Sequence, residues 1–243
     1  IEHKIKKVVF AMRDPNPKVD GISKLKAAGI EITEGVLEEE AKFLNRIFIK
    51  NQSQKLPYVV LKTATTMDGK ISTQNGDSKW ITSDSSRAEV YKMRKKFDCI
   101  LTSSNTVLAD DPTMEHTFKC ILDKNSRIPA NAKILKQGKI YIANKENTPL
   151  KNDTLDLKEI LKSLYRQGIC SVFIECGGTL AGAFLKEGLL DEVWQFIAPK
   201  ILNDNTGLSC FNGIDADRIS QAKNLRIYEI KNIPPDILVK SVL

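Results

Sequence analysis

Short apolar runs alternate with amphipathic stretches along most of the chain. Runs of this kind, bounded by polar or turn-forming residues, are typical of strands buried inside a sheet. They occur at 99–103, 119–123, 139–144, 171–175 and 191–200. Between them, apolar residues recur at helical spacing in 83–97 and 155–168, which predicts two helices. Strands that alternate with helices predict an α/β fold with a mainly parallel sheet flanked by helices.

The end of the chain departs from this alternation. Two strand-like runs, 224–231 and 236–243, are joined by a short turn that contains Pro234 and Pro235. Consecutive strands with so short a connection predict an antiparallel hairpin at the edge of the sheet. Exposed sheet edges offer surfaces for pairing between copies of a chain. We therefore expect a homodimer or homotetramer.

The first part of the chain predicts a separate, smaller segment. Residues 1–50 hold two strand signals with a helix between them, and then a charged helix from about Val36 to Ile49. The polar stretch 51–55 predicts a linker. We therefore expect a small segment, 1–55, followed by a main domain, 56–243.

A glycine pair stands where the apolar run 171–175 meets another predicted helix, TLAGAFLKEG. A helix N-terminus presents free backbone N–H groups and a partial positive charge, and glycine lets the backbone approach a phosphate closely. Gly177 and Gly178 would therefore suit the diphosphate of a dinucleotide. The motif is neither GxGxxG nor a Walker loop. A tight turn in which Gly182 lets helix and sheet pack explains these residues about equally well.

Two aspartates follow the apolar run 99–103. The sequence TSSNTVLADDP predicts a strand end, a polar loop, and then Asp110 and Asp111 before Pro112. Open α/β sheets bind ligands at the carboxyl ends of their strands, where either aspartate could hydrogen-bond a substrate or transfer a proton. Taken without further context, the residues favour the alternative that Asp111 and Pro112 form a turn that Asp110 caps.

An aromatic residue and two arginines accompany the helix predicted at 83–97. Trp80 stands just before its cap, Ser83 or Thr82, and could stack on a flat ring or staple the helix start. Arg87 and Arg94 lie about two helical turns apart, so both fit one face of the helix. Arginine is well suited to a phosphate, and a solvated basic face is the alternative.

The composition narrows the classes of partner. The formal net charge is +7, which fits an anionic substrate and cofactor as well as nucleic acid. The lysines are scattered without an aromatic-interleaved basic patch, so nucleic acid is the disfavoured partner. No apolar run is long enough to span a membrane, and the start at Ile1 lacks the features of a signal peptide. We expect a cytoplasmic protein without a membrane partner, and interpret the chain as a fragment of a longer one.

Cysteine and histidine usage argues against a metal site. Three of the five cysteines, Cys99, Cys120 and Cys170, lie in or beside strand-like runs. They are interpreted as small buried hydrophobes in a reducing compartment. His3 and His116 are the two histidines, and neither has a metal-ligand spacing. No metal is expected.

Taken in order, four segments of the chain closely resemble the reductase half of the bacterial bifunctional riboflavin-biosynthesis deaminase/reductase. They are 57–72, 76–94, 100–112 and 175–202. The resemblance implies a dihydrofolate-reductase-like fold and NADPH as the cofactor. It also implies reduction of 5-amino-6-(5-phosphoribosylamino)uracil to the 5-phosphoribitylamino product, by hydride transfer to ribose C1′.

The same resemblance implies roles for individual residues at matched positions. The catalytic candidates are Asp110, Lys62 and Glu175. The implied cofactor-binding residues are Ala64, Trp80, Thr106, Asp110, Gly177, Gly178, Thr179, Leu180, Ala181, Gly182 and Ala183. The implied substrate-binding residues are Ser78, Arg94, Met114 and Glu175, of which Arg94 would receive the substrate phosphate.

Two positions depart from the family pattern. The family sequence DDPxLxxR has an arginine where this chain has Thr117. His116 or Lys119 could replace its charge, or the phosphate could rely on Arg94. Lys124 stands where the family often has serine, and could meet the 2′-phosphate of NADPH.

Residues 1–55 resemble the tail of the deaminase half of the same family. That half holds zinc with an HxE segment and a later cysteine pair, and neither motif is present, since Lys4 and Ile5 follow His3. We therefore expect no deamination by this chain alone, and assign zinc to sequence upstream of Ile1. Two alternatives stay open: a reductase of the same fold that acts on a dihydropterin, and a non-catalytic domain that assembles or regulates the deaminase.

Overall fold

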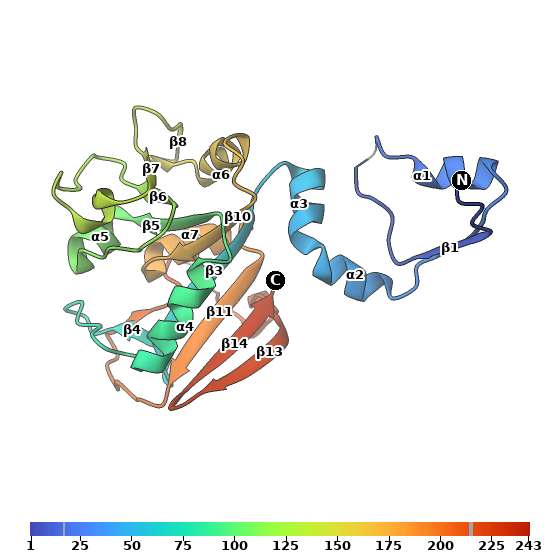
Figure 1. Ribbon diagram of the computed structural model, residues 1–243. Coiled ribbons are helices and arrows are strands. Elements are labelled where there is room, and N and C mark those ends of the chain that lie inside the picture. The colour runs from blue at the N-terminus through green and yellow to red at the C-terminus, as the bar shows by residue number, and fades with distance from the viewer. Residues whose placement is uncertain (17, 214–215) are drawn as a thin grey trace. The chain divides into compact units, whose positions relative to one another are not determined.

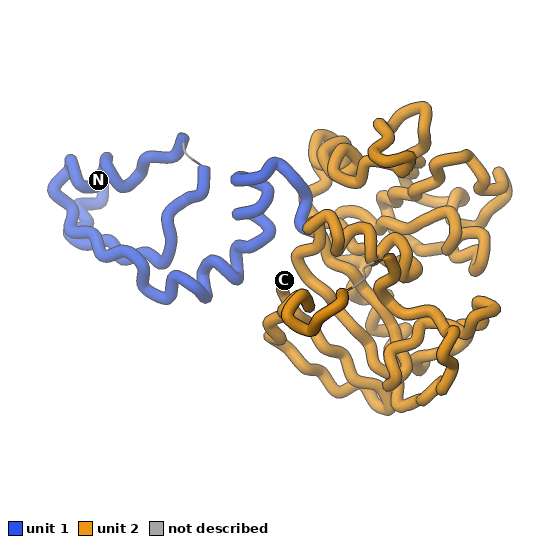
Figure 2. Tube along the Cα trace, turned by 180° about the vertical axis from the view of Figure 1, so that it is seen from behind, with its two compact units in different colours: residues 1–58 blue, residues 59–243 orange. Residues whose placement is uncertain are grey.

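The computed structural model describes residues 1–16, 18–213 and 216–243. The chain divides into two compact units, residues 1–58 and residues 59–243 (Figure 2). Within these described ranges, no helix is both long enough and apolar enough to cross a membrane.

The first unit is a small parallel β-α-β element followed by two helices. Strand β1 (Lys7–Phe10) pairs in parallel with β2 (Glu31–Glu34), and α1 (Gly21–Ala27) connects them. Helices α2 (Glu38–Leu44) and α3 (Arg46–Gln54) follow.

The linker predicted at 51–55 is wrong, because α3 continues to Gln54. The single helix expected from about 36 to 49 is instead two helices that meet at Asn45. The polar residues of 51–55 predict an exposed segment, but Asn51 is buried. Its Nδ2 donates to the carbonyl of Leu56 at 2.7 Å. A buried polar side chain with a hydrogen-bond partner needs no solvent, so polarity alone misidentifies this stretch.

An eight-stranded sheet forms the second unit, in the order β13-β14-β11-β3-β10-β5-β6-β7 (Figure 1). Its strands are β3 (Tyr58–Thr66), β5 (Cys99–Ser103), β6 (Phe118–Leu122), β7 (Lys139–Ala143), β10 (Ser171–Glu175), β11 (Glu192–Ala198), β13 (Arg226–Ile233) and β14 (Asp236–Val242). The strands from β11 to β7 include four parallel pairs, whereas β14 is antiparallel to both β11 and β13. The predicted mainly parallel sheet with an antiparallel C-terminal hairpin is therefore confirmed.

Helices connect the strands of this sheet and cover it. They are α4 (Asp84–Arg94), α5 (Ser104–Asp110), α6 (Leu157–Arg166) and α7 (Gly178–Lys186), with 3-10 turns at Lys133–Lys136 and Ile219–Gln221. Two short antiparallel ribbons lie outside the main sheet: β4 (Lys70–Ser72) with β12 (Leu208–Ser209), and β8 (Leu150–Lys151) with β9 (Thr154–Leu155).

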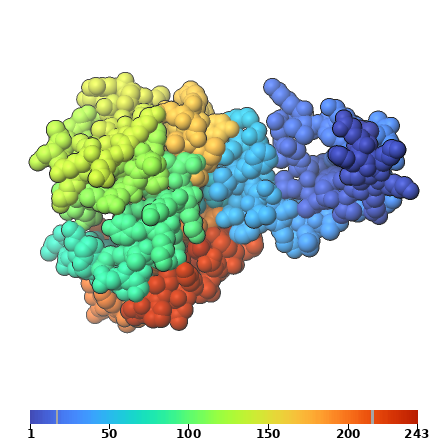
Figure 3. Space-filling model, viewed as in Figure 1, coloured from blue at the N-terminus to red at the C-terminus, as the bar shows by residue number. Residues whose placement is uncertain are grey.

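Helix α4 crosses one face of the sheet from its edge hairpin to its centre. At its start, the hydroxyls of Ser83 and Ser86 donate to Oδ2 of Asp236 on β14, at 2.7 and 2.6 Å. At its end, Arg94 reaches Glu175 on the central strand β10. The space-filling view shows the helix (green) between the hairpin (red) and the 100–150 region (yellow-green) (Figure 3). Ser83 accepts from the N–H of Ser86, which confirms the predicted cap.

The polar loop predicted after β5 is wrong, because residues 104–110 form helix α5. Its cap is Ser103, whose hydroxyl accepts from the N–H of Thr106. Helix α5 ends at Asp110, and its C-cap, Asp111, has a left-handed conformation with φ of 41°. Serine and threonine are as typical of helix starts as of loops, so the same residues predict both.

Candidate active site

A cavity of about 540 Å³ opens at the carboxyl ends of the central strands. The ends of β5 and β6, the first turns of α5 and α7, and residues 71–78 form its walls. This is the position at which open α/β sheets bind ligands. Eight residues singled out from the sequence line it: Ser78, Thr106, Lys124, Gly177, Gly178, Thr179, Leu180 and Ala183.

The glycine turn presents a helix N-terminus to this cavity. Gly177 is the N-cap of α7, and the first residues of the helix line the wall. A Cβ added at Gly177 would meet nothing within 4 Å, so this position faces open space. The first N–H groups of a helix have no partner inside it and carry the positive end of its dipole. The turn is therefore suited to bind an anion such as a diphosphate.

The other two glycines make room for a neighbouring segment. A Cβ at Gly178 would lie 2.2 Å from the carbonyl oxygen of Ser209, and one at Gly182 would lie 1.9 Å from that of Asn212. The N–H of Asn212 also donates to the carbonyl of Gly178 at 3.0 Å. The two interpretations of the glycines therefore apply to different residues. Gly177 faces the cavity, and Gly178 and Gly182 allow close packing, although against residues 209–212 rather than the sheet.

Replacing Gly182 with alanine is expected to destabilise the protein by about 1–3 kcal/mol, the range typical of overpacking. The added methyl group would overlap the backbone of Asn212, which cannot move without releasing the segment from α7. The measurement is the midpoint of denaturant unfolding. Gly177→Ala is the matched control: its backbone φ of −77° suits alanine and its Cβ meets open space. Equal stability of the two variants would contradict the packing role of Gly182.

A buried charge cluster lies next to the glycine turn in sequence. Glu175 ends β10, two residues before Gly177. Its carboxylate accepts from Arg94 at both oxygens, from Nε at 2.5 Å and from Nη2 at 3.1 Å. Nζ of Lys62 lies 3.8 Å from Oε2. The side chains of Lys62, Arg94 and Glu175 are 20%, 12% and 9% exposed, so the cluster is largely shielded from bulk water.

The charges in this cluster shift one another's proton affinity. Burial by itself raises the pKa of Glu175, but the neighbouring Arg94 and Lys62 outweigh it and hold the pKa below its usual value. Burial lowers the pKa of Lys62, an effect that Arg94 adds to and Glu175 opposes. Glu175 is therefore a carboxylate at neutral pH, and Lys62 releases its proton more readily than an exposed lysine does.

Asp110 lies beside Lys79, the residue that precedes Trp80. Asp110 is the last residue of α5, and its Oδ1 lies 3.6 Å from Nζ of Lys79. Trp80 is 62% exposed, and the guanidinium of Arg87 lies over its ring at 4.4 Å. The exposed ring is available to a flat ligand, and the arginine stiffens it through a cation–π contact.

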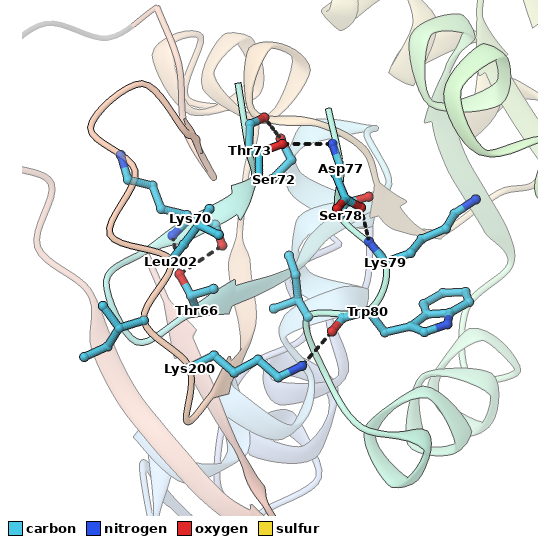
Figure 4. Close-up of a pocket in the computed structure, with 12 residues that line it drawn as sticks. Thr66, Lys70, Ser72, Thr73, Asp77, Ser78, Lys79, Trp80, Lys200 and Leu202 are labelled. Atoms are coloured by element: carbon cyan, nitrogen blue, oxygen red, sulfur yellow. Dashed lines mark hydrogen bonds between the residues drawn. The ribbon is translucent and has the colours of Figure 1, made fainter. Parts of the chain in front are cut away.

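A second cavity of about 400 Å³ adjoins the first (Figure 4). Ser72 and Ser78 belong to the walls of both. Trp80 and Lys200 line only the second, and Nζ of Lys200 donates to the backbone carbonyl of Trp80 at 2.7 Å. Ser78, matched to a substrate contact, therefore lies where the two cavities meet, whereas Trp80, matched to a cofactor contact, lies in the second cavity.

Several predicted site residues lie away from the first cavity. Ala181 and Gly182 are buried within α7. Met114 is 5% exposed and has a left-handed φ of 41°. Ala64 follows Lys62 by two positions on β3, so both share one face of the sheet.

The two proposed replacements for the missing arginine at Thr117 are wrong. Both ring nitrogens of His116 bond to backbone groups, with Nε2 2.9 Å from the carbonyl oxygen of Phe97 and Nδ1 2.9 Å from that of Phe118. Lys119 is 1% exposed, and its Nζ donates to the carbonyls of Ile134 and Thr113. Both side chains are used to hold the backbone, so neither is available to a phosphate.

Sequence reasoning missed a cationic residue in the cavity wall. Arg127 lines the cavity, and its Nη2 donates to Oγ of Ser104 at 2.9 Å and to Oδ1 of Asn105 at 2.5 Å. Lys124 lies in the same wall and pairs with Asp153 at 2.7 Å. The signal was available, since Arg127 follows the carboxyl end of β6 by a few residues.

Two of the five cysteines are fully buried and three are half-buried. Cys99 and Cys120 are fully buried, as predicted, whereas Cys170 is half-buried. Burial raises the pKa of Cys176, beside Glu175, to about 12, so it is an unreactive thiol at neutral pH. In the part of the chain that the structure describes, no group of three or more His, Cys, Asp or Glu residues could hold a metal ion.

Residues 57–239 match the model of the RibD C-terminal domain family. Riboflavin biosynthesis protein RibD of Aquifex aeolicus is 36% identical over 259 residues, which cover 97% of this chain and 72% of that protein. The Escherichia coli protein of the same name is 33% identical over 275 residues, covering 98% and 74%.

Solved structures of relatives agree with this match. Acinetobacter baumannii RibD has a TM-score of 0.82 and 33% identity, covering 99% of this chain and 74% of that one. The diaminohydroxyphosphoribosylaminopyrimidine deaminase/5-amino-6-(5-phosphoribosylamino)uracil reductase of Thermotoga maritima also has a TM-score of 0.82, with 32% identity, covering 99% and 72%. The family that the sequence motifs indicate is thereby confirmed. The chain belongs to the RibD family of riboflavin biosynthesis proteins and carries its C-terminal reductase domain.

Proposed function

We propose that this chain reduces 5-amino-6-(5-phosphoribosylamino)uracil to its 5-phosphoribitylamino product, with NADPH as the hydride donor. One observation carries the proposal: a dinucleotide-sized cavity ends at a glycine turn that follows directly on a buried Lys62–Glu175–Arg94 cluster. The cavity suits a cofactor. The cluster residues line neither cavity, but Glu175 precedes the glycine turn by two residues, so the cluster is the candidate proton source. The name of the Thermotoga maritima relative, at 32% identity, supports the substrate.

The residues present fit the cofactor along the whole cavity. The first turn of α7, from Gly178 to Leu180, would hold the diphosphate through its free N–H groups. Thr106, at the start of α5, lines the opposite wall. Arg127 and Lys124 would receive the 2′-phosphate that distinguishes NADPH from NADH, because both are cations in the same wall.

The reacting end would lie toward Lys62 and Glu175. When bound, NADPH supplies a hydride to C1′ of the open-chain, imine form of the substrate sugar. The imine nitrogen takes up one proton as the carbon is reduced. Lys62 holds that proton at Nζ, and burial lowers its pKa toward the range useful for a general acid. Glu175 orients the ammonium group, and Arg94 keeps the carboxylate ionised.

The substrate phosphate is assigned to Arg94. Its pair with Glu175 uses Nε and Nη2, so Nη1, with two N–H donors, takes no part in that pair. Thr117 carries no charge, and His116 and Lys119 hold the backbone instead. Ser78 would contact the substrate where the two cavities meet.

The proposed function is tested by mixing the purified chain with NADPH and the phosphorylated substrate. Loss of NADPH absorbance and appearance of the ribitylamino product are the expected results. The dephosphorylated substrate is the comparison. A reductase for dihydropterins would not use Arg94 to bind a phosphate, so it would not distinguish the phosphorylated substrate from the dephosphorylated one. Natively folded protein that binds NADPH but never oxidises it would refute the reductase proposal and favour a non-catalytic role.

Arg127→Met is expected to weaken NADPH binding by roughly tenfold or more, the value of a hydrogen bond to a charged group, and to leave NADH binding almost unchanged. The lost guanidinium would contact only the 2′-phosphate, which NADH lacks. The measurement is a titration of nicotinamide fluorescence with each cofactor. Arg166→Met, at the exposed end of α6, is the control. If Arg127→Met lost the same affinity for both cofactors, Arg127 would maintain the cavity wall rather than bind the 2′-phosphate.

A further inference from the structure

Residues 200–212, which we call the strap, join two walls of the cavity. The strap begins just after β11 and ends against α7. Its residues Leu208 and Asn212 line the cavity directly. The resemblance to the family matches residues 200–202 but assigns no site role to any residue of this segment.

The first part of the strap is fastened to the loop that carries Ser78 and Trp80. The N–H of Met67 donates to the carbonyl of Lys200 at 2.7 Å. The carboxylate of Asp68 accepts from the N–H groups of Leu202 and Asn203, each at 3.0 Å. The Thr66 hydroxyl and these two N–H groups lower the pKa of Asp68 to about 2, so it is a carboxylate under all ordinary conditions.

Further contacts follow along the same loop. Nζ of Lys70 donates to the carbonyl of Gly207 at 3.1 Å, and the N–H of Gln74 donates to Asp204 at 3.2 Å. Strand β12 of the strap pairs with β4 of the loop. Lys200 closes this set by donating to the carbonyl of Trp80, as Figure 4 shows. The loop from 67 to 80 is therefore held to the strap at both of its ends and in the middle.

The last part of the strap packs on the cofactor helix without space for a methyl group. The carbonyl oxygens of Ser209 and Asn212 occupy the positions where a Cβ on Gly178 or Gly182 would stand. Contacts this close leave the strap and the first turn of α7 little freedom to move separately. The strap thus transmits the position of α7 to the loop that holds Trp80.

We propose that Asp68, which acts through the strap, and Lys200, which acts through the carbonyl of Trp80, are positioning residues of the reductase site. The proposal rests on the proposed function, in which α7 holds the cofactor diphosphate and Ser78, on the loop that carries Trp80, contacts the substrate. The distance between the hydride donor on the cofactor and the acceptor carbon of the substrate then depends on how firmly the loop is tied to α7. Asp68 lines neither of the two cavities described above, so it reaches the site through its neighbours: the strap amides of Leu202 and Asn203, and the hydroxyl of Thr66.

The test compares Asp68→Asn and Lys200→Met with the unchanged chain. We expect kcat to fall by about tenfold or more in each variant, because a misplacement of about 1 Å far from the chemistry can cost about a hundredfold. Affinity for adenosine 2′,5′-bisphosphate, which reaches only the α7 end, should stay within about twofold, since binding and orientation are separable. Lys200→Arg should restore kcat, because it keeps a donor to the carbonyl of Trp80.

Tryptophan emission provides a readout that does not depend on turnover. Trp80 is 62% exposed and Trp194 only 6% exposed, so quenching by acrylamide reports mainly on Trp80. Lys200→Met should make this emission more quenchable, and adenosine 2′,5′-bisphosphate should protect it in the unchanged chain but not in Asp68→Asn. The second effect requires the strap to connect the two ends.

Two matched controls separate positioning from general damage. Asp20→Asn changes an aspartate that also accepts a backbone N–H, in the first unit, and Lys231→Met removes a surface ion pair with Glu89. Both should keep the original kcat. Turnover by the unchanged chain in the same assay establishes the proposed function, so an unaltered kcat in Asp68→Asn would overturn the positioning role alone. A parallel loss of bisphosphate affinity and kcat would overturn it too, because it would indicate a collapsed cavity.

Discussion

Replacing Lys62 with methionine is expected to lower kcat by about 10²–10⁴-fold, the usual contribution of a positioned general acid. Methionine keeps much of the length and apolar body of the lysine side chain but holds no proton. The fold should persist, because Glu175 keeps both of its hydrogen bonds with Arg94. The measurement is steady-state oxidation of NADPH, with circular dichroism to verify the fold. Binding of NADPH, followed by its fluorescence, should change little.

Lys62→Arg separates a proton donor from a fixed charge. Arginine keeps a cation beside Glu175 but cannot be deprotonated in proteins. If Lys62 donates the proton, Lys62→Arg stays as inactive as Lys62→Met. If it only neutralises Glu175, Lys62→Arg recovers most of the rate, and the general-acid assignment is lost.

The pH dependence of kcat gives the same residue a second test. A general acid must be protonated to act, so kcat falls as the pH rises through its pKa. Burial lowers the pKa of Lys62 from the ordinary lysine value of 10.5, so the fall is expected at a lower pH than an exposed lysine would give. The residual rate of Lys62→Met should lack this alkaline decline. If kcat of Lys62→Met declined at alkaline pH with the same midpoint as in the unchanged chain, the decline would belong to the titration of another group.

The sheet of the second unit is the part of the fold that the sequence predicts best. Strands such as β5 and β10 are buried on both faces, so they appear as uninterrupted apolar runs. The C-terminal hairpin is equally visible, because Pro234 and Pro235 mark its turn. The two stretches wrongly predicted to be irregular, 51–55 and the loop after β5, consist of polar residues in helices. Polar residues at caps and at buried, hydrogen-bonded positions resemble loops unless the tertiary partner, such as Leu56 for Asn51, is known.

Part of the cavity wall could be named from the sequence, since eight of the residues singled out line it, but the pairing within the charge cluster could not. The sequence places Glu175 just before the glycine turn and Arg94 at a helix end, and nothing local indicates that they meet. Their contact depends on how α4 crosses the sheet, which Asp236 controls by bonding to Ser83 and Ser86 at its start. Such long-range contacts carry no periodic signal in the chain.

Removal of Arg94 is the second large effect to be expected. Arg94→Met would leave Glu175 buried with only Lys62 beside it, and breaking a buried ion pair typically costs about 3–5 kcal/mol. Unfolding by denaturant at neutral pH measures this loss. Arg94→Lys should recover part of the stability, because it restores the charge without the paired donors of the guanidinium.

The pH dependence of stability should change in the same variant. The pKa of Glu175 lies below its ordinary value of 4.5 in the folded chain. Its contribution to stability is therefore complete above that value and is lost as the pH falls through the lowered pKa. Without Arg94, the folded pKa rises, so acid unfolding at the lowest pH should depend less on this carboxylate. An identical acid transition in the two proteins would show that Arg94 does not control its ionisation.

The double variant Arg94→Met/Glu175→Gln separates the structural role of Arg94 from its proposed role in substrate binding. Removing both charges leaves no uncompensated carboxylate, so most of the lost stability should return. KM for the phosphorylated substrate should nevertheless stay high, because the cation assigned to the phosphate is absent. The dephosphorylated substrate should show no such rise relative to Glu175→Gln alone.

If stability returns and the phosphorylated substrate binds as well as it does in Glu175→Gln, then Arg94 serves only to hold Glu175 in place. The phosphate would then be bound by residues other than those matched to the family.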